Sequence, residues 1–481
     1  MFFAINPAVK PGYFAWLCGY FAVIVFLGLR FARRMRSLED FFLASRGLPA
    51  GLVFVSLTAS WFGATSILVT TDEAFRTGLN AIWLVGAPAV LTVLIFAFFL
   101  AGPIRRFPIL TLPDLVELRY GKTVRHMTSG LIFWYMVVLA SSQMVAAGQF
   151  FQPFLGMPYI WSLGLGTGIV LIYLVSGGLR AVAVTDSFQC FLLTAGVVGL
   201  ALFLLRASSF EAVLQAASQA PGPGYLNPFS DIKRNLLIVL SFTLAWTISP
   251  IAWQRIQAAH TENKARRGLL LSAAAFIFLY GLVVAIGILA RPLFSSPGLA
   301  SPVLAEMIAL HVSPVLGALL FVAVAAAILS TMDTAINTGA LTLTRDIYGQ
   351  VFSRGTAGKN VPVLVGRVST FLVAVLSFAV ATRFQSILKT IGLASEIMAE
   401  GLFVPGIAMF VFRKKMPLAG GLSLVLGGGF ALASFLSELK IFPLSLPPWP
   451  HSVPYGVGLS LAGYATGFLL ENLRPSPSAQ V

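Results

Sequence analysis

An oxygen-rich face interrupts one of the most apolar stretches of the sequence, between Ala325 and Tyr348. On a helix, four of its residues fall at i, i+3, i+4 and i+7 and share one stripe: Ala327, Ser330, Thr331 and Thr334. Asp333 lies on the flank of this stripe, and a carboxylate inside a membrane is costly unless a cation compensates it. The pattern therefore indicates binding of a small hard cation. The alternative is that the hydroxyls bond to their own helix and Asp333 bonds to a neighbouring segment.

A second group of residues could bind an organic solute. Four tryptophans lie in apolar segments and could form an aromatic cage: Trp61, Trp83, Trp134 and Trp246. Such a cage attracts a quaternary ammonium by cation–π interaction. The alternative for each ring is a place at the membrane interface or in the core. Gln143 and Glu396 complete the candidate substrate-binding set.

Glu396 is also one of two carboxyl groups at i and i+4, the other being Glu400. If the pair lies inside the bilayer, both groups cannot readily be ionised together, so one would hold a proton or the pair would attract a cation. If the helix enters the membrane later, they are acids of the outer face. The sequence leaves both possibilities open.

The elements that carry these residues are membrane spans. The chain is 58% hydrophobic and 10% charged, with a mean hydropathy of +0.89, which excludes an ordinary soluble domain. Repeated apolar runs of about 20 residues predict an all-α polytopic membrane protein with about 13 transmembrane helices. The predicted spans are 12–32, 50–71, 79–101, 127–150, 157–175, 181–206, 235–254, 268–290, 313–340, 361–382, 387–412, 417–437 and 453–472. Short helices are predicted outside the spans at 111–120, 210–217 and 301–311.

Two of these spans are predicted to break near the middle. The second contains Gly63 within a small, polar patch, and the seventh contains Ser249 and Pro250 between two tryptophans. Broken helices at corresponding places in two halves point to a midplane binding site in a secondary transporter. Because the two spans are five apart, they fit an inverted five-plus-five repeat.

The basic residues indicate orientation. Most of the 32 Lys and Arg, Arg255 among them, fall in short loops on one side of the predicted topology. Because basic residues gather in cytoplasmic loops, this placement predicts an outer N-terminus and a cytoplasmic C-terminus. It also accounts for the net charge of +15 without nucleic-acid binding. The sequence has no GxxxxGK[ST] and no HExxH motif, so we expect neither a nucleotide-driven pump nor a metalloprotease, and no enzyme. A solute-sensing membrane module, acting with a separate partner, is the alternative from another class.

Four segments, in order along the chain, resemble motifs of the sodium:solute symporter family. They are Leu38–Pro49 (LEDFFLASRGLP), Leu112–Gly121 (LPDLVELRYG), Gly177–Gln189 (GGLRAVAVTDSFQ) and Ile328–Tyr348 (ILSTMDTAINTGALTLTRDIY). The resemblance implies a LeuT-type core over residues 50–415. An extra helix and the first cytoplasmic loop (1–49) would precede it, and two helices with a short tail (416–481) would follow. It also implies symport by alternating access, with Na+ as the coupling ion.

The resemblance also implies cation ligands. One sodium would lie between the first and eighth core helices, held by the carbonyls of Ala59, Phe62 and Ala327 and the hydroxyls of Ser330 and Thr331. Some members of the family bind a second sodium, for which the corresponding residues here are Asp186, Ser330, Asp333 and Thr334. The alternative for Asp186 is a structural ion pair with Arg180 or another base of the inner face.

Within the family, two segments and one aspartate resemble the high-affinity choline transporter branch: Ala59–Gly63, Ser395–Ile397 and Asp333 in Ser330–Asp333. The seventh span departs from that branch, because Ile251 follows Pro250 where the branch has tryptophan. We therefore expect sodium-coupled symport of choline or another quaternary amine. The alternatives are an amino acid such as proline, a sugar or a carboxylate. The expected location is the inner membrane of a bacterium-like cell.

Overall fold

The computed structural model describes residues 10–32, 46–107, 111–220, 224–294, 302–352, 363–412, 414–441 and 445–473, and every named element in these ranges is a helix. The α-helices are α1 (Lys10–Ala32), α3 (Ala50–Trp61), α4 (Thr70–Thr77), α5 (Gly86–Ile95), α6 (Ala101–Arg106), α7 (Leu112–Leu155), α8 (Tyr159–Ala207), α9 (Phe210–Ser218), α10 (Ile232–Thr247), α11 (Pro250–Ala258), α12 (Glu262–Ala290), α13 (Val303–His311), α14 (Pro314–Leu341), α15 (Gly349–Phe352), α16 (Val363–Ala381), α17 (Ile387–Gly401), α18 (Phe403–Val411), α19 (Pro417–Glu438) and α20 (Val453–Leu473). Shorter turns of other helix types are η2 (Thr65–Val69), η3 (Gly78–Trp83), η4 (Phe96–Leu100), η5 (Arg291–Leu293) and η6 (Thr342–Tyr348).

The predicted membrane spans are confirmed as helices. In the described residues, nine helices are long and apolar enough to cross a membrane, and the bent pair α10–α11 makes a tenth. Three shorter apolar helices account for the remaining predicted spans: Gly12–Gly28, Ala50–Trp61 and Tyr159–Val175. Residues 38–45 of the first family motif lie outside the described residues.

The short helices outside the spans are also present, with one difference. α9 and α13 lie where they were predicted. The difference is that the predicted helix 111–120 forms the first part of α7, and Gly121, whose φ of 85° and ψ of 178° are not helical and suit glycine, separates it from the rest of α7. A capping box between Thr111 and Asp114 starts this helix.

Both predicted breaks are present. α3 ends at Trp61, and Phe62, with φ −92° and ψ 60°, leaves the helical conformation before the chain turns helical again at Ala64. The seventh span bends by 44° between α10 and α11. A third interruption, at Leu402 between α17 and α18, was not predicted.

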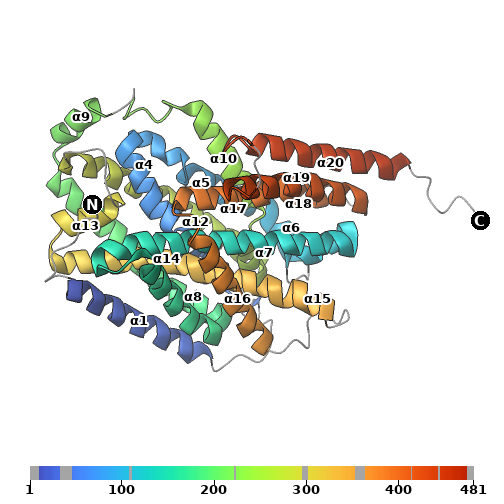
Figure 1. The fold of residues 1–481 in the computed structure, drawn as a ribbon, viewed down its shortest axis with the longest axis horizontal. Coiled ribbons are helices and arrows are strands. Elements are labelled where there is room, and N and C mark those ends of the chain that lie inside the picture. The colour runs from blue at the N-terminus through green and yellow to red at the C-terminus, as the bar shows by residue number, and fades with distance from the viewer. Residues whose placement is uncertain are drawn as a thin grey trace, which may run out of the picture.

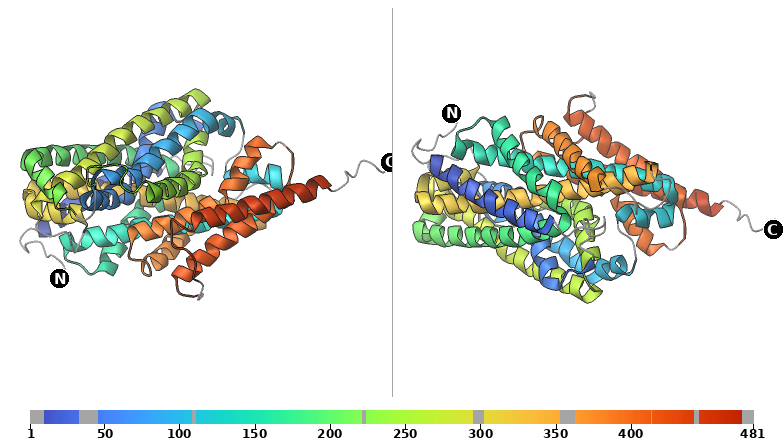
Figure 2. Two further views of the ribbon diagram at one scale, coloured as in Figure 1. Left: turned by 90° about the horizontal axis from the view of Figure 1, so that it is seen from above. Right: turned by 90° about the horizontal axis from the view of Figure 1, so that it is seen from below.

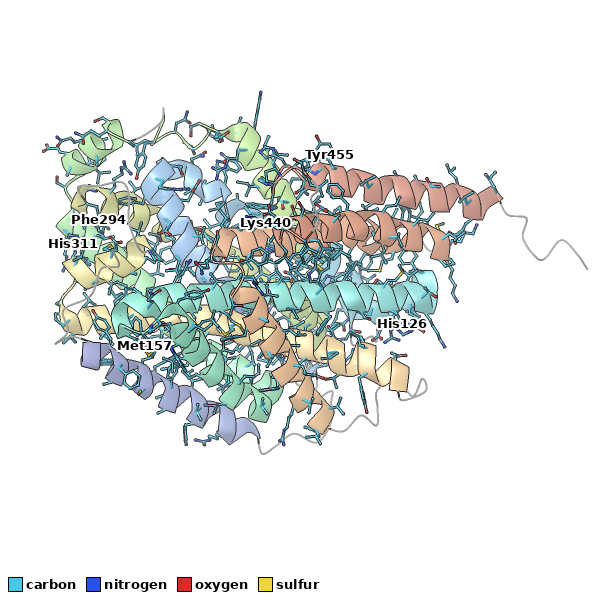
Figure 3. All side chains as sticks on the ribbon, viewed as in Figure 1. His126, Met157, Phe294, His311, Lys440 and Tyr455 are labelled. Carbon is cyan, nitrogen blue, oxygen red and sulfur yellow. The ribbon has the colours of Figure 1, made fainter. Side chains whose placement is uncertain are left out.

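Several long helices, among them α7, α14, α19 and α20, run along the long axis of the molecule, whereas α8 and α16 cross it obliquely (Figure 1). α14 is buried along most of its length and packs against α7, α8 and α16. α9 and α13 lie at one end of the bundle, whereas α6 and α15 lie at the other (Figure 1). α19 and α20 pack together as a hairpin on one side (Figure 2). His311 and His126 lie at opposite ends of the bundle, away from its centre (Figure 3).

Candidate functional site

The break in α3 places backbone oxygens opposite α14. The Phe62 N–H donates to the Thr58 carbonyl, which closes the last turn of α3. The Ala59 carbonyl oxygen accepts a hydrogen bond from the Ser330 hydroxyl across the helix interface, at 3.0 Å. Because a helix end leaves carbonyl oxygens without partners in the helix, such a break exposes oxygen ligands inside the bundle.

The stripe on α14 faces this break. The Ser330 hydroxyl also lies 3.0 Å from the Ala327 carbonyl oxygen, and the Thr331 hydroxyl lies 3.4 Å from it. Both contacts are bonds within the same helix, so the local bonding expected as the alternative is present alongside the contact with Ala59. Gly63 packs directly on Thr331, since a Cβ added there would lie 2.8 Å from Thr331 Cβ. The structure thus brings the break together with four of the five residues predicted to bind the first sodium, namely Ala59, Ala327, Ser330 and Thr331, and Phe62 adjoins them.

A partly open pocket lies beside this cluster. Residues from both broken spans, from α7 and from α17 line it: Ser60, Trp61, Gly63, Thr65, Ser66, Val85, Ala89, Tyr135, Leu139, Gln143, Trp246, Ser249, Ile251, Thr331 and Ile391. Thr331 belongs both to the pocket wall and to the candidate sodium ligands, so the two sites adjoin.

Three of the predicted solute-binding residues line this pocket. The Trp61 and Trp246 rings lie 5.8 Å apart at 51°, and Trp61 also stacks on Phe276. Gln143 is held in place because its Oε1 accepts from the Ala64 backbone N–H at 3.0 Å. That N–H follows the break, so the amide of Gln143 fixes the start of the second half-helix.

The structure does not bring the other three predicted residues to the pocket. The Trp83 indole N–H donates to the Pro228 carbonyl, so this ring holds the loop before α10. Trp134 packs edge-on against Phe435 of α19 and lines a groove between α7, α16 and α19. Glu396 accepts from Ser434 and Ser452, outside the pocket. Helical position alone did not reveal which way these side chains face.

Arg255, which sequence analysis placed in a loop, lies among the residues predicted to bind the second sodium. Asp186 accepts from Ser56 at 2.7 Å, and the guanidinium of Arg255 lies 3.8 Å from the same carboxyl oxygen. Arg255 was predicted to lie in a cytoplasmic loop, but it is fully buried. The reason is that α11 starts directly after the break, so Arg255 comes one and a half turns into a membrane half-helix. The side chain of Arg180 lies outside the described residues.

Arg255 also connects the rest of this set. Its guanidinium donates to the Ser60 and Thr334 hydroxyls, each at 3.1 Å, and these hydroxyls are 3.0 Å apart. Asp333 instead accepts from the Tyr173 hydroxyl at 2.6 Å. One oxygen of each aspartate, Asp186 and Asp333, is buried without a hydrogen-bond partner in the structure.

An ion-pair network at the start of α7 was not predicted from the sequence. Arg125 pairs with Asp114 at 2.9 Å and with Glu117, and it lies 3.5 Å from Asp346 of η6. Arg345 pairs with Asp114 at 2.7 Å. The network ties the start of α7 to the segment after α14. Asp114 and Asp346 lie in segments that resemble family motifs, but one sequence does not show that distant segments form ion pairs with each other.

Two discontinuous spans that meet beside a midplane pocket define a secondary transporter of LeuT-type fold. Solved structures agree with this fold. One is a Na+-coupled sialic acid symporter in a substrate-bound outward-open state, with a TM-score of 0.76 and 18% identity over 95% of this chain and 98% of that one. Another is MhsT in complex with L-phenylalanine, with a TM-score of 0.50 and 17% identity, over 87% of this chain and 97% of that one.

The family model of the sodium:solute symporter family matches residues 41–428, so the chain belongs to that family. It is similar to the sodium/glucose cotransporter of Vibrio parahaemolyticus, with 29% identity over 89% of this chain and 85% of that protein. It is also similar to the sodium/proline symporter of Haemophilus influenzae, with 24% identity over 82% of each chain. The protein is therefore a multi-pass membrane protein of a transporter family, and sodium-coupled solute symport is its activity.

Proposed function

We propose that the protein imports a small organic solute with sodium by alternating access. The carbonyls of Ala59, Phe62 and Ala327 and the hydroxyls of Ser330 and Thr331 bind the sodium. The observation that carries this proposal is the 3.0 Å contact between Ser330 and Ala59, which joins the break to α14. A cation between them would replace hydrogen bonds with ion–oxygen contacts. Its binding would therefore fix α14 against the broken span.

The solute occupies the pocket beside this site. The paired rings of Trp61 and Trp246 supply an aromatic wall, which supports choline or another quaternary amine by cation–π attraction. Hydroxyl groups and the Gln143 amide supply polar partners that equally suit proline or a sugar. Glucose and proline are the solutes in the names of the two relatives. The pocket adjoins Thr331, so bound sodium and bound solute would stabilise each other.

Whether a second sodium binds depends on Arg255. Its guanidinium lies beside Asp186 and bonds the hydroxyls of Ser60 and Thr334, where a second cation would bind. We propose that Asp186, Asp333 and Thr334 form a charged connection between helices and that any second sodium must compete with Arg255 there. This differs from the first site, where uncharged oxygens are the ligands.

The topology completes the proposal. The basic residues Arg105 and Arg345 lie at the same end of the bundle as α6 and α15, which supports a cytoplasmic location for that end (Figure 1). The Arg125 network would then close the inner side, and its ion pairs would separate when the pocket opens to the cytoplasm. With this orientation in a bacterial inner membrane, the N-terminus lies outside.

The test is a tryptophan-fluorescence melt of the purified protein in sodium or potassium buffer with choline, betaine, proline, glucose and a carboxylate. A ligand that binds only the folded state at about 100 times its Kd adds about 2.7 kcal/mol to the free energy of unfolding. We expect sodium to stabilise the protein and one solute to add more only when sodium is present. In the variant with Ser330→Ala and Thr331→Ala, the response to sodium should disappear while the melt in potassium is kept.

Each outcome has a consequence. If sodium stabilises the double variant as strongly as the wild type, the assigned ligands are wrong. If sodium and potassium act alike on the wild type, the coupling proposal fails for this chain, and solute sensing or proton coupling replaces it. The stabilising solute names the substrate class.

A further inference from the structure

The two carboxyl groups that the transport site does not use lie between α17 and the α19–α20 hairpin. Glu396 and Glu400 are one turn apart on α17, and both are buried, with 1% and 0% exposure. Neither carboxyl group is therefore exposed to solvent. α17 packs against both helices of the hairpin. The pair is therefore enclosed by protein on the side away from the central pocket.

Glu396 has partners for its charge. One carboxyl oxygen accepts from the Ser434 hydroxyl of α19 at 3.0 Å. The other accepts from the Ser452 hydroxyl, just before α20. Two donors, one on each oxygen, are the arrangement that stabilises a carboxylate.

Glu400 has no such partners. Both of its carboxyl oxygens are buried without a hydrogen bond in the structure. The side chain packs tightly on α20, since a Cβ at Gly456 would lie 2.5 Å from Glu400 Cγ and closer still to the carboxyl group. The backbone packs equally closely on α19, where a Cβ at Gly427 would lie 2.8 Å from the Glu400 carbonyl carbon. An ionised carboxylate in such surroundings costs several kcal/mol.

The neighbouring charges make an ionised Glu400 worse. Glu396 acts on it electrostatically, and Glu438 of α19 acts on Glu396 in turn. Glu438 is paired with Lys389, so that lysine is already engaged. The remaining charged or titratable groups of the packed elements lie toward their ends or are bonded elsewhere: Asp114, Glu117, Arg119, Tyr120, Lys122, Arg125, His126 and Tyr135 on α7, Lys233 and Arg234 on α10, His451 before α20, and Tyr455, Tyr464 and Glu471 on α20. α18 and η2 carry none.

We propose that Glu400 is a proton-binding site, with the carboxyl group held in its neutral form between α17 and the hairpin. A proton suits the site because it bonds to one carboxyl oxygen, removes the negative charge and needs no further ligand. A metal ion would need several oxygen ligands, and the tight packing at Gly456 leaves no space for them. The site is separate from the sodium ligands, so the proposal does not rest on sodium coupling.

Protonation of Glu400 would affect transport because α17 connects this residue to the central pocket. α17 contributes Ile391 to the wall of the central pocket and carries Glu400 two and a half turns further along. Loss of the proton would place a second negative charge beside Glu396 and push the hairpin from α17. Transport is therefore expected to decline as the pH rises and Glu400 ionises.

Infrared difference spectroscopy of the wild-type protein tests the proton directly. The C=O stretch of a neutral carboxyl group should be present at neutral pH, decline on alkaline titration and be missing from Glu400→Gln. The presence of the band and its loss on alkaline titration are measured on the wild type, and the comparison with Glu400→Gln assigns the band to Glu400. A spectrum in which the band is absent at neutral pH, or is unchanged in Glu400→Gln, overturns the proposal.

Thermal melts over a range of pH provide the second test. The folded protein keeps the proton, whereas the unfolded chain releases it near pH 4.3, so the wild type should lose stability as the pH rises above that value. Glu400→Gln mimics the neutral acid and should lose this part of the pH dependence, whereas the control Glu438→Gln should keep it. If both variants keep the wild-type profile, the proposal fails. If lithium or sodium stabilises the wild type but not Glu400→Gln, the site binds a metal ion and the proton assignment is wrong.

Discussion

Replacing Gly63 by alanine would place a methyl group at the contact between the broken span and α14. The added Cβ would lie 2.8 Å from Thr331 Cβ and 2.9 Å from Gln143 Oε1, and closer still to the Thr331 hydroxyl. Real Cβ atoms do not approach other heavy atoms so closely, so Thr331 or the backbone at the break must move. Either movement separates the Thr331 hydroxyl from the other proposed sodium ligands.

The size of the effect follows from this contact. Overpacking by one methyl group in a dense interior costs about 1–3 kcal/mol. If the whole cost falls on the sodium-bound arrangement, sodium affinity decreases about 5- to 150-fold, at 1.4 kcal/mol for each factor of ten. The matched control is Gly51→Ala on α3, the half-helix before the break, because a Cβ there would have nothing within 4 Å. That substitution should leave sodium affinity unchanged.

The assay is the sodium concentration that gives half-maximal thermal stabilisation, measured against a potassium background at constant ionic strength. We expect Gly63→Ala to shift this concentration upward while its melt in potassium alone stays close to that of Gly51→Ala. An unchanged sodium midpoint would refute the reasoning. A loss of stability that is equal in sodium and in potassium would also refute it, because the strain would then act on the fold and not on the cation site.

Two further predictions concern the pocket and the buried base. Trp61→Ala should raise the solute concentration for half-maximal stabilisation at least tenfold while Trp134→Ala has no effect, because of these two rings only Trp61 lines the pocket. Equal shifts for the two variants in a solute titration would remove Trp61 from the binding wall. Arg255→Met should cost about 3–5 kcal/mol of unfolding free energy, because it leaves Asp186 buried without its base. Adding Asp186→Asn should restore most of this loss, and a denaturation series in which the two losses simply add would show that the pair is not coupled.

The span positions and both breaks could be predicted from the sequence because a bilayer imposes simple rules. Each span must be a run of about 20 apolar residues with its backbone bonded internally. A glycine among small polar residues, or Ser249 before Pro250, is then the exception that marks a break. The interruption at Leu402 was not predicted, although Gly401 precedes it and Pro405, which has no N–H to donate to a carbonyl four residues earlier, follows it.

The facing of side chains was harder to predict. Trp61 and Trp246 lie within a few residues of the breaks, and the pocket lies beside the breaks, so both rings had to be near the pocket. Trp83 and Trp134 lie within or beside intact helices, where one rotation of the helix sends the ring to the pocket or away from it. Residue type could not choose between these rotations. The contacts with Pro228 and Phe435 that decide them come from segments distant in the sequence.

Arg255 shows how a rule that holds for loops fails at a broken helix. Counting basic residues assumes that each lies in water beside the membrane. The break before Pro250 instead starts a half-helix that carries the guanidinium inside, where it reaches α3 through Ser60, α8 through Asp186 and α14 through Thr334. Because Arg255 belongs to the half-helix beyond the break, any tilt of α11 changes all three contacts together. The same side chain that sequence analysis counted as a topology signal is therefore a mechanical link between the two repeats.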